Sequence, residues 1–156
     1  MFCLDANVWV YYLDADLPEH EDVAPQVDAL LATEPLFTTT VLQMEVVHYL
    51  ANTLAESGST VGEFLSLRDT TVADLTTADV EMGADLLHEY PNAGIGGRDA
   101  TVLAAMERYG IERLWTHDGA FAEVAKEEGY IVHDPTKGSV PDDLDTLDDG
   151  DSPNDG

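Results

Sequence analysis

The 156-residue chain is long enough to form one domain with a proper hydrophobic core. It contains 32 Asp and Glu against 6 Lys and Arg, a formal net charge of −26, yet 44% of its residues are hydrophobic, which argues against a largely disordered chain. The single cysteine, Cys3, excludes an intrachain disulfide, and no apolar run approaches the roughly 20 residues that span a bilayer. No signal peptide is visible, so we expect a cytoplasmic protein that does not contact a membrane.

The excess of acidic residues has three possible explanations. Disorder is one, but the periodic hydrophobic segments argue against it, and binding to basic proteins is another. The third is a halophilic protein, because at about 1 M salt the Debye length is roughly 3 Å and a dense carboxylate surface is tolerated. The acids are spread along the whole chain, which favours the halophilic explanation.

The predicted elements alternate between strands and helices. Met1–Leu4 is a short apolar run that ends in Asp5, which is typical of a strand buried in a parallel sheet, and the first helix is predicted from about Val8 to Leu13. This alternation predicts an α/β fold, a three-layer α/β/α sandwich around a central parallel sheet of about five strands. Further strands are predicted at 36–39, 71–75, 111–116 and 130–133, and further helices at about 24–32, 40–56, 60–67, 77–89, 98–108 and 119–127.

Composition divides the chain into a domain and a tail. All periodic segments lie within residues 1–137, whereas residues 138–156 contain seven aspartates, no Lys or Arg and few apolar side chains. We therefore expect one domain over residues 1–137 and an acidic, disordered tail over residues 138–156.

Acidic residues follow two of the predicted strands. Asp5 comes directly after the first strand, and Asp118 follows the fourth strand within the sequence Thr116-His117-Asp118-Gly119. Open α/β sheets bind ligands in the crevice outside the carboxyl ends of their strands. Either Asp can also be a simple helix N-cap, and for each residue taken alone this structural role is the more common one.

Two further acids lie on predicted helices. Glu45 shares a helix face with Val41 and Leu42, so it points along a largely apolar surface, where an unpaired carboxylate is costly. Asp99 shares a face with Val102 of its own helix. The structural alternatives are a Glu that reaches water at the edge of its face and an Asp that stabilises the helix dipole.

These four acids can converge on one crevice of the sheet. Crowded carboxylates repel one another and raise one another's pKa values. Mg²⁺ or Mn²⁺ removes this conflict, because hard divalent cations prefer oxygen ligands. Such ions activate water and hold the attacking and leaving oxygens in phosphodiester hydrolysis. The sequence therefore predicts a metal-dependent phosphoryl-transfer enzyme.

The order of these motifs resembles a PIN-domain ribonuclease of the VapC toxin type. The resemblance rests on LDANVW at positions 4–9, on Glu45 in the helix after the second strand, and on GRDATVLAAMERYGIERLWTHDGAF at positions 97–121. It extends from Met1 to about Asp134. It implies an α/β/α sandwich, Mg²⁺- or Mn²⁺-dependent endonucleolytic cleavage of RNA, a homodimer, and inhibition by a small antitoxin protein.

The resemblance also implies roles for individual residues. Asn7 and Thr116 are supporting polar groups that orient carboxylates or water. The catalytic and metal-binding acids are Asp5, Glu45, Asp99 and Asp118.

The distribution of basic residues departs from that of most RNA-binding proteins. There is no Lys or Arg before Arg68, so no basic patch is visible in the first half of the chain. Arg98 adjoins Asp99, and we expect it to contact a substrate phosphate, because its guanidinium group matches the geometry of phosphate oxygens. An ion pair between Arg98 and a nearby surface acid is the alternative.

Three alternative functions remain open. One is a PIN nuclease that processes RNA outside a toxin pair. Another is a phosphohydrolase similar to haloacid dehalogenases, whose signature requires a second Asp where this chain has Asn7. The third is a non-catalytic PIN-fold binding module, which the loss of an acid would favour, although all four acids are present.

The net charge of −26 leads to a prediction about salt. At low ionic strength the carboxylates repel one another through unscreened water, so we expect the melting temperature to rise steeply with KCl into the molar range. Thermal unfolding followed by circular dichroism at increasing KCl measures this dependence. A melting temperature that is the same in dilute buffer and in molar salt would rule out the halophilic explanation.

Overall fold

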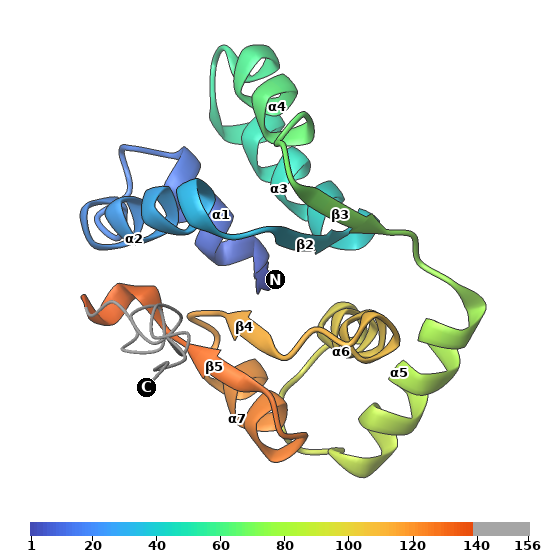
Figure 1. Cartoon of the computed structure of the whole chain (residues 1–156). Helices are drawn as coiled ribbons and strands as arrows, with labels where there is room; N and C mark the ends of the chain where they lie inside the picture. Colours follow the sequence, from blue (N-terminus) through green and yellow to red (C-terminus); the bar gives the residue numbers. More distant parts are fainter. Residues whose placement is uncertain (139–156) are drawn as a thin grey trace, which may run out of the picture.

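A five-stranded parallel sheet forms the centre of the protein, in a computed structural model that describes residues 1–138 (Figure 1). The strand order is β3-β2-β1-β4-β5, and all four neighbouring pairs are parallel. The predicted acidic tail, apart from its first residue, lies outside the described residues. The strands are β1 (Phe2–Leu4), β2 (Leu36–Thr39), β3 (Thr70–Ala73), β4 (Arg113–Trp115) and β5 (Ile131–His133).

Helices cover both faces of this sheet, which confirms the predicted three-layer α/β/α architecture. One hydrophobic cluster is formed with α1 to α4 and the other mainly with α5 to α7. Within residues 1–138, no helix is both long enough and apolar enough to cross a membrane. The helices are α1 (Ala6–Leu13), α2 (His20–Thr33), α3 (Thr40–Thr53), α4 (Ser57–Leu65), α5 (Thr77–Glu89), α6 (Gly97–Tyr109), α7 (Gly119–Glu127) and the short 3₁₀ helix η1 (Pro135–Lys137).

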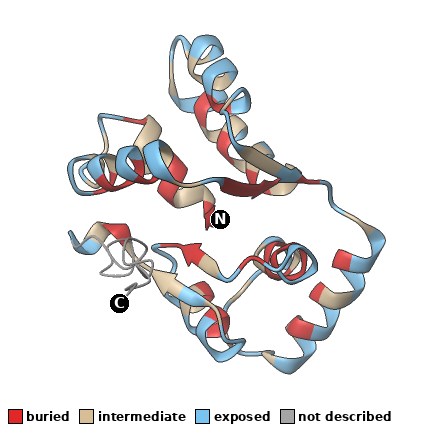
Figure 2. Ribbon diagram, in the orientation of Figure 1, coloured by how far each residue is buried: buried red, intermediate tan, exposed pale blue. Residues whose placement is uncertain are grey.

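The central strands are short and buried on both faces, as Figure 2 shows for β2 and β4. Successive side chains of a strand point to opposite faces of the sheet, so each strand contributes to both clusters. Cys3, Phe37 and Leu114 pack with α6 and α7. Phe2, Leu36 and Trp115 pack on the opposite face with α1 and α2.

The helix boundaries and one helix face differ from the predictions. The helix predicted from residue 24 begins already at His20 and contains Pro25. For residues 77–89, hydrophobic periodicity predicts a buried stripe of Val80, Ala84 and Leu87, and this prediction was wrong, since Val80 is 51% exposed. The buried residues of α5 are Asp79, Gly83 and Leu86.

The packing of α5 on α6 explains its unexpected buried face. Arg108 of α6 donates two hydrogen bonds to the carboxylate of Asp79, at 2.9 and 2.8 Å, and this pairing lowers the pKa of Asp79. Gly83 packs on Ala100, where a Cβ atom would make an ordinary contact at 3.5 Å. The pairing of Asp79 with Arg108 therefore accounts for this face, and hydrophobic periodicity does not reveal it.

Candidate metal centre and active site

Asp5 lies at the carboxyl end of β1, where the backbone passes directly into α1. Its backbone N–H donates to the carbonyl of Trp115 at the end of β4, at 2.9 Å. Its carboxylate caps α1 by accepting a hydrogen bond from the N–H of Ala6 at 2.7 Å, and it also accepts from Thr116 Oγ1 at 2.6 Å and from Asn7 Nδ2 at 3.0 Å. The predicted capping role is therefore real, and it places the carboxylate in the crevice between β1 and β4.

Burial controls the acidity of Asp5. The residue is only 7% exposed, and this burial raises the pKa of its carboxyl group to about 6, although the hydrogen bonds from Thr116 and Ala6 oppose the shift. The charges of Asp99 and Asp118 raise the pKa of Asp5 further. These three carboxylates, which lie far apart in the sequence, therefore share one electrostatic environment.

Thr116 and Asn7 connect the ends of β1 and β4. The hydroxyl of Thr116 donates to Asp5 and accepts from the N–H of Asp118 at 3.0 Å. Asn7 donates to Asp5 and accepts from the N–H of His117 at 3.3 Å. The structure thus places both predicted supporting residues beside the acids, with hydrogen bonds that fix the orientation of Asp5.

Asp118 and Asp99 each lie at the N-terminus of a helix. Asp118 caps α7 by accepting a hydrogen bond from the N–H of Phe121 at 3.1 Å. Asp99, in the first turn of α6, accepts from the N–H of Gly96 at 2.9 Å. The pKa of Asp99 is raised by burial and by the nearby charge of Asp118, while Arg98 opposes this shift. Together with Asp5 at the start of α1, all three clustered carboxylates thus lie at the positive ends of helix dipoles.

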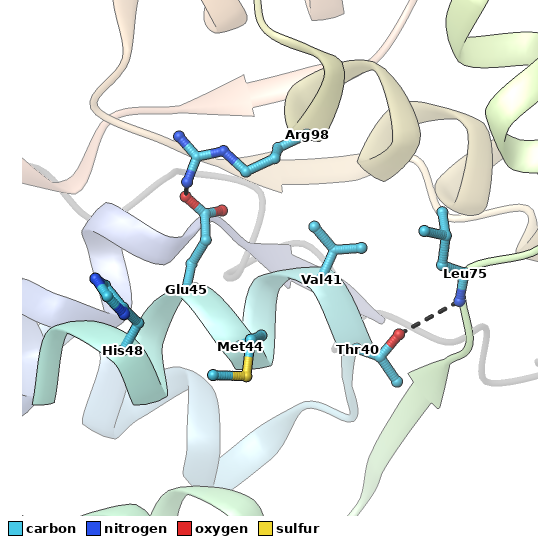
Figure 3. A pocket seen from close by; sticks show the side chains of 7 residues that line it. All are labelled: Thr40, Val41, Met44, Glu45, His48, Leu75 and Arg98. Atoms are coloured by element: carbon cyan, nitrogen blue, oxygen red, sulfur yellow. Dashed lines mark hydrogen bonds and ion pairs between the residues drawn. The ribbon is translucent and has the colours of Figure 1, made fainter. Parts of the chain in front are cut away.

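Glu45 is positioned differently from the other three acids. It projects from α3 and forms an ion pair with Arg98, the residue before Asp99 in α6 (Figure 3). Both side chains line a pocket of about 520 Å³ whose other walls include Met44 and Leu75. The structure therefore pairs Arg98 with Glu45, one of the predicted site acids. The buried face of α3 is formed by other residues: Leu42, Val46 and Leu50.

The donor atoms of this region fit a hard divalent cation in their chemistry. Asp5, Asp99 and Asp118 supply carboxylate oxygens, and a cation would relieve the repulsion that raises the pKa values of Asp5 and Asp99. As the side chains stand, no group of three His, Cys, Asp or Glu residues within 1–138 lies close enough together to hold a metal ion. Because Glu45 is bound to Arg98, a complete ligand set requires side-chain movement at this position.

The sequence analysis missed a second polar group next to these acids. His117 Nδ1 lies 3.2 Å from Asp134 Oδ2 and 3.0 Å from Thr136 Oγ1. These residues follow β4 and β5, which are neighbours in the sheet. The carboxyl ends of neighbouring parallel strands meet at one edge of the sheet. The position of Asp134 directly after the predicted fifth strand was therefore a signal that it lies near the other acids.

The strand order and the acid cluster define an α/β/α protein with an acidic site where the strand order reverses, between β1 and β4. The sequence matches the family described as PIN domain over residues 2–127. The chain belongs to the PIN-domain family, as its motifs predicted.

Solved structures of low sequence identity share the fold. VapC20 of Mycobacterium tuberculosis, a toxin that cleaves the sarcin-ricin loop, has a TM-score of 0.68 and 19% identity, covering 84% of this chain and 97% of that chain. FitAcB from Neisseria gonorrhoeae has a TM-score of 0.64 and 19% identity, covering 86% and 98%. A toxin-antitoxin complex from Klebsiella pneumoniae has a TM-score of 0.60 and 21% identity, covering 86% and 98%. A comparison with curated protein sequences gives no match.

The raised pKa of Asp5 leads to a prediction about stability without metal. In EDTA at pH 7 we expect Asp5→Asn to be at least as stable as the wild type. The folded-state pKa of about 6 exceeds the ordinary value of 3.8, so ionisation of Asp5 costs stability as the pH rises from about 4 to above 6. The raised pKa corresponds to about 1–3 kcal/mol in the free energy of unfolding. The gain in the variant is smaller than this, because an amide cannot accept all the hydrogen bonds that the carboxylate accepts.

Urea unfolding of both proteins between about pH 4 and pH 8 in EDTA measures this effect. The advantage of the variant should shrink toward pH 4, where wild-type Asp5 is protonated. Asp85→Asn, which removes an exposed carboxylate of α5, controls for the reduced net charge. Equal stability of wild type and Asp5→Asn at every pH in this range would show that Asp5 is only a helix cap, because Asn caps a helix about as well as Asp.

Proposed function

We propose that this protein is a metal-dependent endoribonuclease that hydrolyses RNA phosphodiester bonds. The observation that carries the proposal is the electrostatic coupling of Asp5, Asp99 and Asp118 at the carboxyl ends of β1 and β4, in a chain of the PIN-domain family. Carboxylates whose charges raise the pKa values of Asp5 and Asp99 suit Mg²⁺ or Mn²⁺ as the cofactor.

We assign Asp5, Glu45, Asp99 and Asp118 as the residues that would hold the metal. When bound, the metal supplies an activated water and charge stabilisation at the scissile phosphate. Thr116 and Asn7 hold the Asp5 carboxylate in a fixed orientation through their hydrogen bonds.

Arg98 neutralises Glu45 in the structure and occupies the mouth of the same region. Its side chain is 67% exposed, so its guanidinium group can also reach a substrate phosphate. In this role Arg98 exchanges one anionic partner, the Glu45 carboxylate, for another.

We further propose that the enzyme is the toxin of a toxin-antitoxin pair, acts in the cytoplasm and forms a homodimer. The support for the toxin role comes from structures with the same fold, among them a toxin-antitoxin complex from Klebsiella pneumoniae and the toxin VapC20 of Mycobacterium tuberculosis. The small antitoxin would be the protein partner. An RNA-processing nuclease outside such a pair, or a non-catalytic binding module, would use the same fold, whereas membership of the PIN-domain family argues against a haloacid dehalogenase relative.

Cleavage of RNA with and without Mn²⁺ tests the enzymatic proposal. We expect wild-type protein to cleave a single-stranded RNA in Mn²⁺ and not in EDTA. Asp5→Asn should lose more than about 100-fold in rate, because loss of a ligand costs more than loss of an outer hydrogen bond to a ligand. Mn²⁺ should also raise the melting temperature of the variant by less than it raises that of the wild type.

Asp85→Asn, with its exposed carboxylate on α5, serves as the control and should cleave like the wild type. Equal stabilisation by Mn²⁺ in wild type and Asp5→Asn, with activity retained, would reject the four-acid site. RNA cleavage that persists in EDTA would reject the metal requirement.

The ion pair of Arg98 and Glu45 leads to a separate prediction. Arg98→Ala frees Glu45 to bind the metal, so the Mn²⁺ concentration for half-maximal thermal stabilisation should fall by up to about fivefold, the range of an exposed ion pair. At saturating Mn²⁺ the KM for RNA should rise, because a phosphate contact is lost. Arg68→Ala, at another exposed base, is the control. An unchanged Mn²⁺ midpoint would mean that Arg98 does not compete with the metal for Glu45.

A further inference from the structure

Both lysines of this chain line one pocket. The six basic residues are four arginines and two lysines, Lys126 and Lys137. These lysines are eleven positions apart, on α7 and η1, yet they border the same cavity of about 390 Å³. In a chain with a net charge of −26, this convergence is a distinct electrostatic feature.

The arginines have other surroundings. Arg98 pairs with Glu45, and Arg108 donates to the buried Asp79 and to the carbonyl of Asp74. Arg113 lies over the ring of Phe2. Arg68 lies between α4 and β3, on a different part of the fold.

The lysine pocket shares a wall with the acid cluster. Asp118 lines the pocket, and it is also one of the carboxylates that raise the pKa values of Asp5 and Asp99. The first turn of α7 borders the pocket at Gly119, where a Cβ atom would meet nothing within 4 Å. An anion held in the pocket therefore lies directly beside the proposed cleavage site, at the favourable end of a helix dipole.

Carboxylates within the pocket oppose anion binding only in part. Besides Asp118, the pocket is lined by Glu123 and Asp134. Asp134 is already engaged, because His117 and Thr136 contact its carboxylate and Lys137 Nζ lies 3.8 Å from it. Lys126 forms no ion pair with any residue in the described part of the chain. Its ammonium group is available to an incoming anion.

We propose that Lys126 and Lys137 bind a backbone phosphate of the RNA that neighbours the scissile phosphate. The inference rests on the proposed ribonuclease function, because it assumes that the substrate strand passes over Asp118. Each nucleotide of a single strand carries a phosphate, so a strand held at the acid cluster presents its next phosphate to an adjoining site. Lysine ammonium groups bind such phosphates as point charges.

The experiment measures RNA affinity in a variant that lacks both positive charges. A fluorescently labelled single-stranded RNA is titrated with wild type and with Lys126→Gln/Lys137→Gln, in Ca²⁺ in place of Mn²⁺, over a series of KCl concentrations. We expect the Kd of the variant to rise about tenfold. The slope of log Kobs against log salt should become shallower by about 0.7, because the lysines contact one phosphate and each phosphate contact on a single strand contributes about 0.7.

Two further variants make the result specific. Lys126→Arg/Lys137→Arg keeps both charges and should retain the wild-type salt slope. Arg68→Gln removes one exposed base outside the pocket and should leave Kd and slope near their wild-type values. An equal loss in Arg68→Gln would show that only the overall charge matters, and would overturn the proposal.

The outcomes for the phosphate site and for the nuclease activity are separable. If wild type cleaves RNA but Lys126→Gln/Lys137→Gln binds it with unchanged Kd and slope, the phosphate site is wrong and the nuclease activity stands. If the lysine variant loses affinity but wild type cleaves no RNA, the phosphate site stands and the nuclease activity is wrong. If wild type does not bind single-stranded RNA, the phosphate site is overturned.

Discussion

The burial of one carboxylate, that of Asp5, is the constraint on which the site depends. Asp5 ends the central strand β1 and begins α1, so its position is fixed by the sheet and by the helix together. Water is excluded from it, and three protein donors take the place of water, those of Ala6, Asn7 and Thr116. These donors hold the carboxylate in place, but they do not offset the burial that raises its pKa to about 6, and the charges of Asp99 and Asp118 add to that shift. The charged form of Asp5 is therefore the costly one in this fold.

The sequence predicted the fold well because its signals are local and repeated. Short apolar runs ending in turn residues marked the strands, and Asp118 was correctly predicted as the cap of α7. The crevice followed from the rule that carboxyl ends of parallel strands meet at one edge. The coupling of Asp5 with Asp99 and Asp118 agrees with this reasoning, although their role as metal ligands stays a proposal.

Features that depend on pairs of residues in different elements could not be predicted in the same way. The face that α5 buries is selected by the ion pair of Asp79 with Arg108, which acts across the contact with α6. The direction of Glu45 is likewise decided by Arg98, which lies 53 positions away in the sequence. Hydrophobic periodicity describes one helix at a time and contains no information on such partners.

The acidic composition and the proposed RNA substrate impose opposite demands on this protein. A chain with a net charge of −26 repels nucleic acid at long range. At 1 M salt this repulsion is screened beyond a distance of about 3 Å. Direct contacts between a cation and a phosphate act within that distance, so they retain their effect where long-range attraction is lost. A few well-placed cations next to the acids can therefore replace the broad basic surface of ordinary RNA-binding proteins.

The start of α6 shows how closely the opposite charges are arranged. Adjacent residues there have opposite roles: Asp99 contributes a carboxylate to the cluster, and Arg98 neutralises Glu45 across the crevice from α3. Because both charges lie on the first turn of one helix, any shift of α6 moves them together. Arg108 lies in the last turn of the same helix, where it pairs with Asp79 of α5. The two ends of α6 therefore have different charged partners: the first turn faces Glu45 of α3, and the last turn is anchored on α5.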